Sequence, residues 1–273
     1  MTNPKTMRKP YLLLLFLLPF IGNAQVVNTE KLRSEQEQGW LAEAGFDFGL
    51  TRNKAGQTLR LGSRLRLEYQ QGNSRWMLLG AYNLTQFRNV EAPGSVPRNF
   101  ANNAFGHLRY NYFVNDWLTW EAFTQYQYDE IQQIDARILS GTGPRVKLLK
   151  TDTSQLFFGL LYMFEHEESR DVFEEPTQRT VDVTLNDNRL SAYLSGGFKI
   201  TETFSINHVT YFQPNLEDFF GDFRISSETS LSFKISDKLS FRTYFQLMYD
   251  ERPPIPVPNT MYTLSNGFEL SLD

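Results

Sequence analysis

The sequence predicts an all-β protein: a single closed antiparallel transmembrane β-barrel of about 12 strands, preceded by an N-terminal signal peptide. Three observations predict this fold. Apolar and polar residues alternate along most of the chain, the alternating segments run for about 10 to 14 residues, and short connections alternate with longer ones. Globular strands average about 5–6 residues, whereas tilted membrane-spanning strands need about 9–11, so the segment length favours a membrane barrel.

The N-terminus has the layout of a secretory signal peptide. A positively charged start precedes an apolar run from Tyr11 to Ile21, and small residues follow at 22–24. The run is shorter than the roughly 20 apolar residues of a spanning helix, and Pro19 interrupts it, so an uncleaved anchor is the less favoured alternative. We expect three parts, which are a signal peptide at 1–24, a short periplasmic segment at 25–39 and the barrel at 40–273.

The composition limits the partners of the exported chain. The 273 residues include no cysteine, so the chain has neither disulfides nor a lipidated N-terminal cysteine. Loss of Lys5, Arg8 and Lys9 with the signal peptide would leave 24 basic against 31 acidic residues, and a net charge of about −7 makes a nucleic-acid partner unexpected. The expected partners are outer-membrane lipid and, during biogenesis, the barrel-assembly machinery of a Gram-negative bacterium.

The first segments show the alternation clearly. In WLAEAGFDFGL, the rings of Trp40, Phe46 and Phe48 alternate with Glu43 and Asp47. The stretches LRLGSRLRLEY and LTWEAFTQYQYD repeat the pattern, and no segment has a convincing helical period. Taken in order, the predicted strands are 40–51, 57–70, 75–87, 102–113, 117–130, 137–148, 154–167, 188–200, 204–213, 222–235, 239–250 and 260–272.

The connections between these segments fall into two sets. Short turns alternate with mostly longer links, such as APGSVP and ERPPIPVPN. Outer-membrane barrels show this asymmetry, with short periplasmic turns at one rim and longer loops at the other. The acidic run EHEESRDVFEE at 165–175 is expected to be a solvated loop, and divalent-cation binding there is the less favoured alternative.

The cost of placing charge in lipid decides which face of each strand points outward. A lipid-facing Arg at the bilayer midplane costs about 2–4 kcal/mol, so Arg60, Arg64 and Arg66 together would cost roughly 6–12 kcal/mol on that face. We therefore expect the rings to face lipid and the charges to face a polar interior. A soluble β protein with the opposite orientation is the alternative. Rings near segment ends would form the interfacial girdles, and they are Trp40, Trp76, Tyr112, Trp117, Tyr128, Tyr249 and Tyr262.

The expected interior narrows the lumen. Twelve strands fall between barrels of about eight strands, which side chains fill, and barrels of about 16–18, which leave a channel. Long arginines paired with carboxylates across the lumen should leave at most a small, salt-sensitive and weakly anion-preferring pore. The candidate lumen-lining residues are Arg60, Arg64, Arg66, His107, Arg109, Glu121, Gln125, Asp129, Arg137, Arg145, Glu228, Arg242 and Asp250.

The segment GTGP interrupts one predicted strand. Proline cannot donate to a strand ladder, so we predict a bulge or a local kink at Gly141–Pro144, where the glycines would leave room for larger lumenal neighbours. A phosphate-binding loop is not expected here, because no helix follows and the Gly-Lys-Ser/Thr ending is missing.

Four stretches taken together carry a family resemblance, and they are EAFTQYQYDE, LSGTGPRVKL, YFQPNLEDF and YDERPP. Through them the chain resembles the salt-induced outer-membrane protein family, which is catalogued as a domain of unknown function. The resemblance covers roughly 40–273. It implies an outer-membrane barrel and no established reaction, ligand or catalytic residue. The C-terminal SNGFELSL is similar to the signal of barrels inserted by the bacterial assembly machinery, with Ser265, Gly267, Leu270 and Leu272 at its positions.

The sequence offers little catalytic chemistry. Some outer-membrane lipid hydrolases place a His and, two residues later, a Ser on one strand face. The three histidines of this chain are followed at that spacing by Arg109, Glu168 and Thr210, so no Ser is placed correctly. We predict a non-enzymatic outer-membrane barrel without cofactor or metal, either a narrow pore or an envelope-structure protein. A lipid-modifying enzyme and a surface-binding barrel that acts through its long loops are the alternatives.

Overall fold

The computed structural model describes residues 38–92, 94–173 and 179–270, which form one antiparallel sheet of twelve strands. Each strand pairs with the next one along the chain, so the all-β class and the strand number are confirmed. The predicted signal peptide lies outside the described residues, as does Leu272. The strands are β1 (Gly39–Asn53), β2 (Gly56–Gln71), β3 (Ser74–Arg88), β4 (Arg98–Phe113), β5 (Leu118–Asp129), β6 (Ile134–Lys150), β7 (Ser154–Phe173), β8 (Arg179–Lys199), β9 (Phe204–Pro214), β10 (Phe223–Lys234), β11 (Leu239–Asp250) and β12 (Thr260–Leu270).

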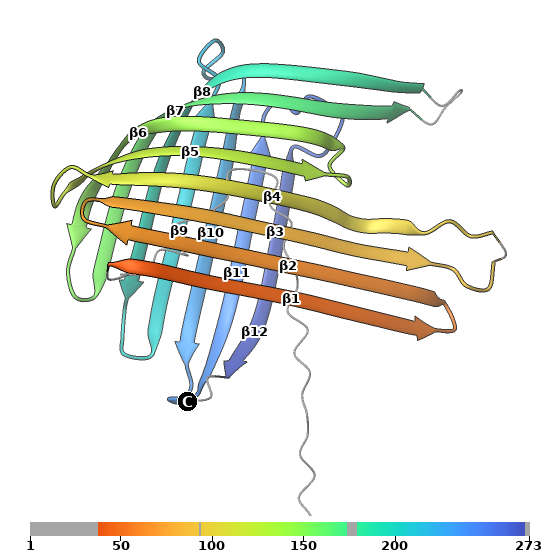
Figure 1. Cartoon of the computed structure of the whole chain (residues 1–273), viewed down its shortest axis with the longest axis horizontal. Helices are drawn as coiled ribbons and strands as arrows, with labels where there is room; N and C mark the ends of the chain where they lie inside the picture. Colours follow the sequence, from red (N-terminus) through yellow and green to blue (C-terminus); the bar gives the residue numbers. More distant parts are fainter. Residues whose placement is uncertain (1–37, 93, 174–178, 271–273) are drawn as a thin grey trace, which may run out of the picture.

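The sheet curls on itself, so that β9–β12 lie behind β1–β5 in the view of Figure 1. Within the described residues the ladders join consecutive strands only, which leaves β1 and β12 as the two edges of the sheet. The twelve antiparallel strands of the predicted barrel are therefore present, but β1 and β12 are not paired with each other.

The hairpin of β7 and β8 is longer than the sequence predicts. Its strands have 20 and 21 residues, about twice the 9–11 that a tilted strand needs to cross a bilayer. The expected loop at 168–187 is wrong over its described part, because Glu168 pairs with Thr184 and the ladder continues to Phe173 and Arg179. The sequence from 165 to 171 is polar at every position, so it looked like a loop. Residues 174–178 lie outside the described part.

The strand β6 runs without a shift through its Gly-Pro segment. Its pairs with β7 on either side, at Thr142 and Arg145, keep one register, and Pro144 stands opposite Trp120 in the regular ladder to β5. The predicted bulge is therefore absent at this place, and the ladder to β7 is interrupted at Gly143 and Pro144 without a change of register. The missing N–H of Pro144 is accommodated because the pairing with β7 is skipped at that position, so the rest of the ladder keeps its register.

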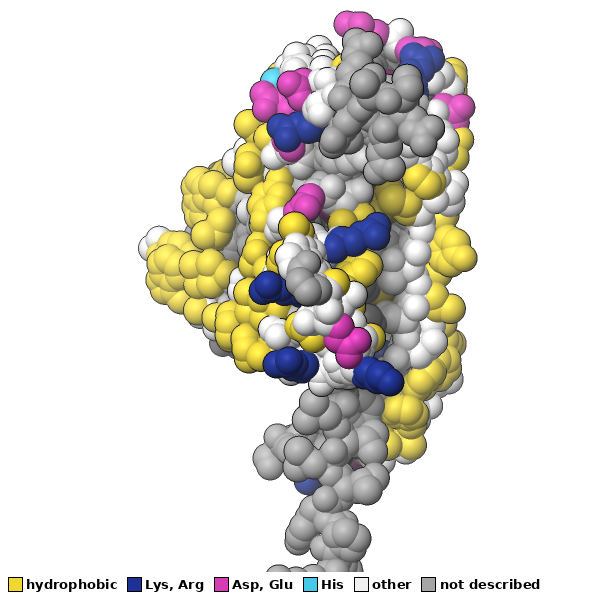
Figure 2. Space-filling model, turned by 90° about the vertical axis from the view of Figure 1, so that its right-hand side faces the viewer, with side chains coloured by type: hydrophobic (Ala, Val, Ile, Leu, Met, Phe, Trp, Pro, Cys, Tyr) yellow, Lys and Arg dark blue, Asp and Glu magenta, His cyan; other side chains and the backbone are white. Residues whose placement is uncertain are grey.

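Charge is buried and large apolar side chains are exposed. Arg109 and Glu165 are 1% and 0% exposed, whereas Trp40 and Phe46 are 73% and 72% exposed. Figure 2 looks onto the rim of the longer links, where charged side chains gather in the middle and hydrophobic ones along both flanks. No helix in the described part of the chain is long and apolar enough to span a membrane.

Aromatic rings form a row on the outward face near the short turns. Trp40 stands opposite Tyr69, which stands opposite Trp76, which in turn stands opposite Tyr110. The rings of the first and the last pair each lie 4.5 Å apart between centroids. A row of this kind is typical of a membrane–water interface, where amphipathic rings collect.

Candidate functional site

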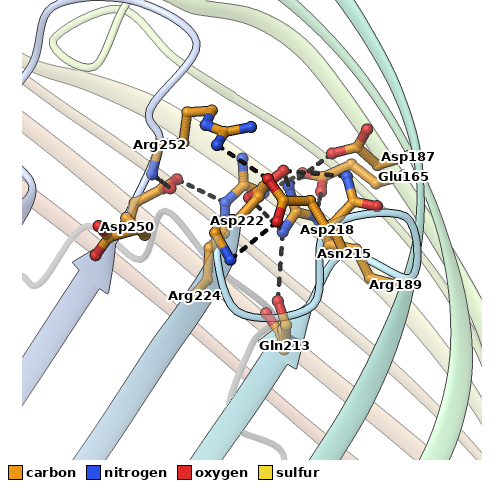
Figure 3. A network of polar contacts seen from close by, with 12 residues as sticks. Glu165, Asp187, Arg189, Gln213, Asn215, Asp218, Asp222, Arg224, Asp250 and Arg252 are labelled. Carbon is orange, nitrogen blue, oxygen red and sulfur yellow. Dashed lines mark hydrogen bonds and ion pairs between the residues drawn. The ribbon is translucent and has the colours of Figure 1, made fainter.

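One buried carboxylate organises the interior near the longer links. Glu165 of β7 accepts hydrogen bonds from Arg137 Nε at 2.6 Å and from Arg189 Nε at 2.8 Å, and it also pairs with Arg224. These arginines belong to β6, β8 and β10, so strands on separate parts of the wall meet at one group (Figure 3). Alternation along each strand brings them inward, since side chains two residues apart share a face.

Each of the three arginines contacts a second carboxylate. Arg189 Nη2 lies 2.6 Å from Asp187 Oδ2, and its Nη1 lies 3.0 Å from Asp222 Oδ1. Arg224 Nε donates to Asp250 Oδ2 at 2.6 Å. We call the whole set the ion-pair network, and it consists of Arg137, Glu165, Glu167, Asp187, Arg189, Asp222, Arg224 and Asp250.

The ion-pair network holds five carboxylates against three guanidinium groups. Most of its members are buried, and charges taken out of water are tolerated only when they are paired and hydrogen-bonded. Arginine suits this role because its planar fork binds two carboxylates at once. Among the described residues, no group of three or more His, Asp or Glu side chains is arranged to hold a metal ion.

Two of the longer links cover the ion-pair network. Arg252, in the link between β11 and β12, pairs with Asp218 in the link between β9 and β10 at 3.0 Å (Figure 3). Ile255 of the first link is 4% exposed, and a cavity of only about 50 Å³ remains beneath it. The network and these links therefore occupy the mouth of the sheet on this side.

An apolar layer lies next to the network in the interior, and the alternation of the sequence did not predict it. Glycine makes the space: a Cβ on Gly159 would collide with the ring of Tyr193, and one on Gly141 would lie 2.6 Å from the ring of Phe123. The predicted role of Gly141 as a space-maker for lumenal neighbours is thus confirmed. The layer consists of Phe123, Leu139, Leu161, Met163, Tyr193, Val209 and Tyr211.

A second polar group borders the apolar layer on β4 and β5. Arg109 Nη1 lies 3.7 Å from Glu121 Oε2, and the hydroxyl of Tyr193 donates to the same carboxylate at 2.6 Å. His107 Nδ1 lies 3.0 Å from Gln125 Oε1, and the ring of His107 stacks on that of Phe123 at 5.5 Å. The polar contacts tie the predicted interior positions of these strands to the apolar layer.

A histidine and a threonine meet on the opposite face. Val209 and Tyr211 point inward, so His208 and Thr210, which alternate with them, lie on the outer face of the sheet. His208 Nε2 lies 2.8 Å from Thr210 Oγ1, and His208 Nδ1 lies 2.9 Å from Thr229 Oγ1. The spacing of two residues that a His-assisted nucleophile needs is therefore realised, with a threonine in place of serine.

A family model described as "Protein of unknown function, DUF481" matches residues 42–269. The chain belongs to this DUF481 family. The match agrees with the resemblance to a domain of unknown function, and the name salt-induced outer-membrane protein stays an expectation. Among curated proteins, none matches the chain.

Several solved structures resemble this DUF481 chain at low identity. The NanC porin is 13% identical with a TM-score of 0.45 over 84% of this chain and all of its own. The KdgM porin is 10% identical with a TM-score of 0.40 over 85% of this chain and all of its own. A mutant of the TodX monoaromatic hydrocarbon channel is 10% identical with a TM-score of 0.44 over 91% of this chain and 84% of its own. Such likeness transfers neither ligand nor activity to the DUF481 chain.

The predicted lumen-lining residues of the DUF481 chain fall into three groups. Arg60, Arg64 and Arg242 are exposed on β2 and β11, next to the edge strands. Arg66 and Asp250 are half-buried, and Arg66 pairs with Glu43 and Glu68 near the open seam instead of crossing the interior. The buried ones are His107, Arg109, Glu121, Gln125, Asp129, Arg137, Arg145 and Glu228.

The centre of the ion-pair network was not among the predicted residues. Glu165 and Glu167 lie at the end of the predicted strand 154–167, but the run EHEESRDVFEE at 165–175 was also expected to be a solvated loop because it is so acidic. The alternation of Tyr162 and Phe164 with Met163 and Glu165 continues into that run, and this signal would have placed both glutamates on the inward face of a strand.

Proposed function

We propose that the chain is a non-enzymatic outer-membrane β-barrel with a narrow lumen that is shut toward the longer links. The observation that supports membrane insertion is the inversion of the two faces: Glu165 and Arg189 are buried, while Trp40, Phe46 and Phe48 are exposed. Soluble proteins rarely expose apolar patches of such extent. Lipid, in contrast, stabilises exposed rings and excludes exposed charge.

Closure of the barrel by pairing of β1 with β12 follows from the same environment. An unpaired strand edge in hydrocarbon leaves backbone groups without partners, at several kcal/mol each. The two edge strands have 15 and 11 residues, enough to cross a bilayer, and an even number of strands makes them antiparallel neighbours. We therefore place a β1–β12 seam in the membrane-embedded protein.

The interior supports a low-conductance state. Below the covering links, the ion-pair network crosses the lumen, and the apolar layer beneath it excludes water. Arg60 and Arg64 lie away from this blockage. The narrowing expected from the arginines at 60, 64 and 66 is therefore proposed instead for the network and the apolar layer.

Fractionation and planar-bilayer recordings test this function. The protein should sediment with outer membranes and show heat-modifiable migration, and wild type should conduct little. The inward substitutions Leu161→Ala, Met163→Ala and Tyr193→Ala together should raise conductance. Their neighbours Leu160→Ala, Tyr162→Ala and Leu194→Ala, on the exposed face of the same strands, should leave it unchanged. A folded inward variant that still fails to conduct would favour a purely structural role in the envelope.

A lipid hydrolase is the second candidate, because His208 and Thr210 face the lipid in hydrogen-bonding contact. In such a reaction His208 Nε2 would take the proton of the Thr210 hydroxyl, whose oxygen would attack the carbonyl of an acyl ester, while Thr229 fixes the ring. The ester C–O bond would break, the alcohol would leave with the proton from His208, and water would then hydrolyse the acyl-threonine to the free acid. A phospholipase assay with purified protein separates the candidates. Activity that His208→Ala and Thr210→Ala both abolish would replace the proposed function.

A further inference from the structure

A large cavity lies at the end of the interior opposite the ion-pair network. It measures about 990 Å³ and is bordered by the turns that follow β4 and β6, including Asn115 and Thr151, and by the end of β8 at Lys199. The apolar layer closes its floor, since Val209 belongs both to that layer and to the wall of the cavity. The cavity is therefore a vestibule that is open at the rim of the short turns.

Two arginines in the wall of the vestibule are held against phenylalanine rings. The guanidinium carbon of Arg145 lies 3.6 Å from the ring centroid of Phe157, and that of Arg75 lies 5.7 Å from the centroid of Phe113. Both arginines are more than nine-tenths buried. A guanidinium stacked on an aromatic face keeps its N–H groups directed sideways in a fixed plane. The two charges therefore stay in place before any ligand arrives.

Lysines add to the positive charge of the same wall. Lys147, Lys150 and Lys199 border the cavity, which gives five cations with the two arginines, against the three carboxylates of Asp116, Asp152 and Glu228. Within the described part of the chain, neither Lys147 nor Lys199 takes part in an ion pair. A cavity with an excess of positive charge and partly apolar walls concentrates anions.

The other wall groups are suited to an organic molecule. The rings of Trp117 and Phe157 offer apolar surface, and the amides of Gln155 and Asn207 offer donors and acceptors between them. The volume is within the range of about 300–1,000 Å³ that is usual for small-molecule sites, which combine apolar lining with a few placed polar groups.

We propose that this vestibule is a binding site for a small organic anion, with two or more carboxylate or phosphate groups on an apolar or ring framework. The anionic groups pair with Arg75 and Arg145, Lys147 and Lys199 neutralise the remaining charge, and the framework lies against the rings. The ligand enters through the rim of the short turns, because the network and the apolar layer block the other end. In the proposed orientation this rim faces the periplasm.

Calorimetric titration of the whole protein in detergent micelles tests this site, with benzene-1,3,5-tricarboxylate and pyrophosphate as probes and neutral benzene-1,3,5-trimethanol as the control. The tricarboxylate should bind, and the neutral triol should not. Binding should weaken at least tenfold in Arg145→Gln, and Arg145→Lys should restore part of it. Arg170→Gln, an exposed arginine in β7 outside the vestibule, should bind as wild type does.

Pyrophosphate should bind more weakly than the tricarboxylate, since it has no ring; equal binding would overturn the assignment of the rings.

A second variant keeps the test decisive if Arg145→Gln does not fold. The double variant Lys147→Gln/Lys199→Gln removes two unburied charges, so it should fold and lower the affinity severalfold. The proposal would be overturned if wild type did not bind the tricarboxylate. It would also be overturned if the folded vestibule variants bound the tricarboxylate as tightly as wild type and Arg170→Gln do. Binding in micelles does not depend on conduction. If wild type conducts little, the inward triple variant conducts more and no anion binds, this inference alone would be contradicted. If the anion binds but the folded inward triple variant still fails to conduct, only the proposed lumen would be contradicted.

Discussion

At the scale of single residues, the interior depends on a few groups with several partners each. Glu165 pairs with three arginines, and no solvent reaches it. A buried ion pair adds little to stability when complete, because desolvation offsets the attraction. Loss of the shared partner is different, because three buried guanidinium groups then keep only their outer carboxylates.

The substitution Glu165→Gln tests this dependence. It keeps the size of the side chain but leaves three guanidinium groups facing a neutral amide, so we expect the free energy of unfolding to fall by about 3–5 kcal/mol. The matched control is Glu168→Gln, which lies on the same strand, is exposed and contacts only His166 among described side chains. Urea titration of the protein folded in lipid vesicles measures both. Similar losses in the two variants would show that the network does not hold the strands together.

Gly143 tests the close approach of β6 and β7. A Cβ there would collide with the carbonyl oxygen of Leu160 and lie 2.7 Å from the Cα of Leu161. Because both obstacles are backbone atoms, Gly143→Ala should cost at least the 1–3 kcal/mol typical of overpacking. Gly106→Ala is the control, since nothing lies within 4 Å of a Cβ built there. The same urea titration should separate the two variants, and equal stability would mean that the strands can move apart at no cost.

The sequence predicted residue roles only where periodicity decides them. Alternation identified Arg109, Glu121 and Gln125 as interior positions, and the structure buries all three. Alternation did not show that some interior positions are apolar, so the layer around Leu161 and Tyr193 was not predicted. Partners across the interior depend on strand tilt and curl, which a linear pattern does not contain.

At the scale of the strands, the sequence came close to the structure where one face of the strand is apolar and the other polar. The strand predicted at 239–250 has those bounds, and the strand predicted at 204–213 ends one residue early. The failure is the β7–β8 hairpin, whose ends extend past the length that a membrane requires. There the apolar face is no longer needed, so alternation fades although the ladder from Glu168 to Phe173 persists.

The seam between β1 and β12 can be tested by engineered disulfides, since the chain has no cysteine of its own. Phe46→Cys on β1 is combined in turn with Tyr262→Cys, Leu264→Cys or Phe268→Cys on β12. Closure should let one pair cross-link in isolated outer membranes, because a disulfide forms only when the Cα atoms lie within about 7 Å.

The positive control for this experiment is Phe46→Cys with Ser63→Cys, which stand opposite each other in the β1–β2 ladder. Gel mobility with and without reductant detects the cross-link. A control that cross-links while none of the seam pairs does would show that the edges remain apart in the membrane.

At the scale of the whole molecule, the two ends of the interior differ in charge and in cover. The end with longer links holds the acid-rich ion-pair network beneath Ile255, and the end with short turns holds the open vestibule with Arg75 and Arg145. An anion would therefore meet opposite electrostatic conditions at the two mouths. The function depends on which mouth faces the cell exterior.

The alternation of short turns and longer links predicts that orientation, because outer-membrane barrels keep their short turns in the periplasm. We expect Glu217→Cys, in the link between β9 and β10, to react with a membrane-impermeant maleimide on intact cells. Lys238→Cys, in the turn between β10 and β11, should react only after the outer membrane is permeabilised. Both positions are exposed, and neither side chain has a described partner, so the substitutions should not disturb folding. Labelling of Lys238→Cys on intact cells, with Glu217→Cys protected, would invert the orientation. The vestibule would then face the medium, and its anion would have to come from outside the cell, because the ion-pair network and the apolar layer block passage from the other side.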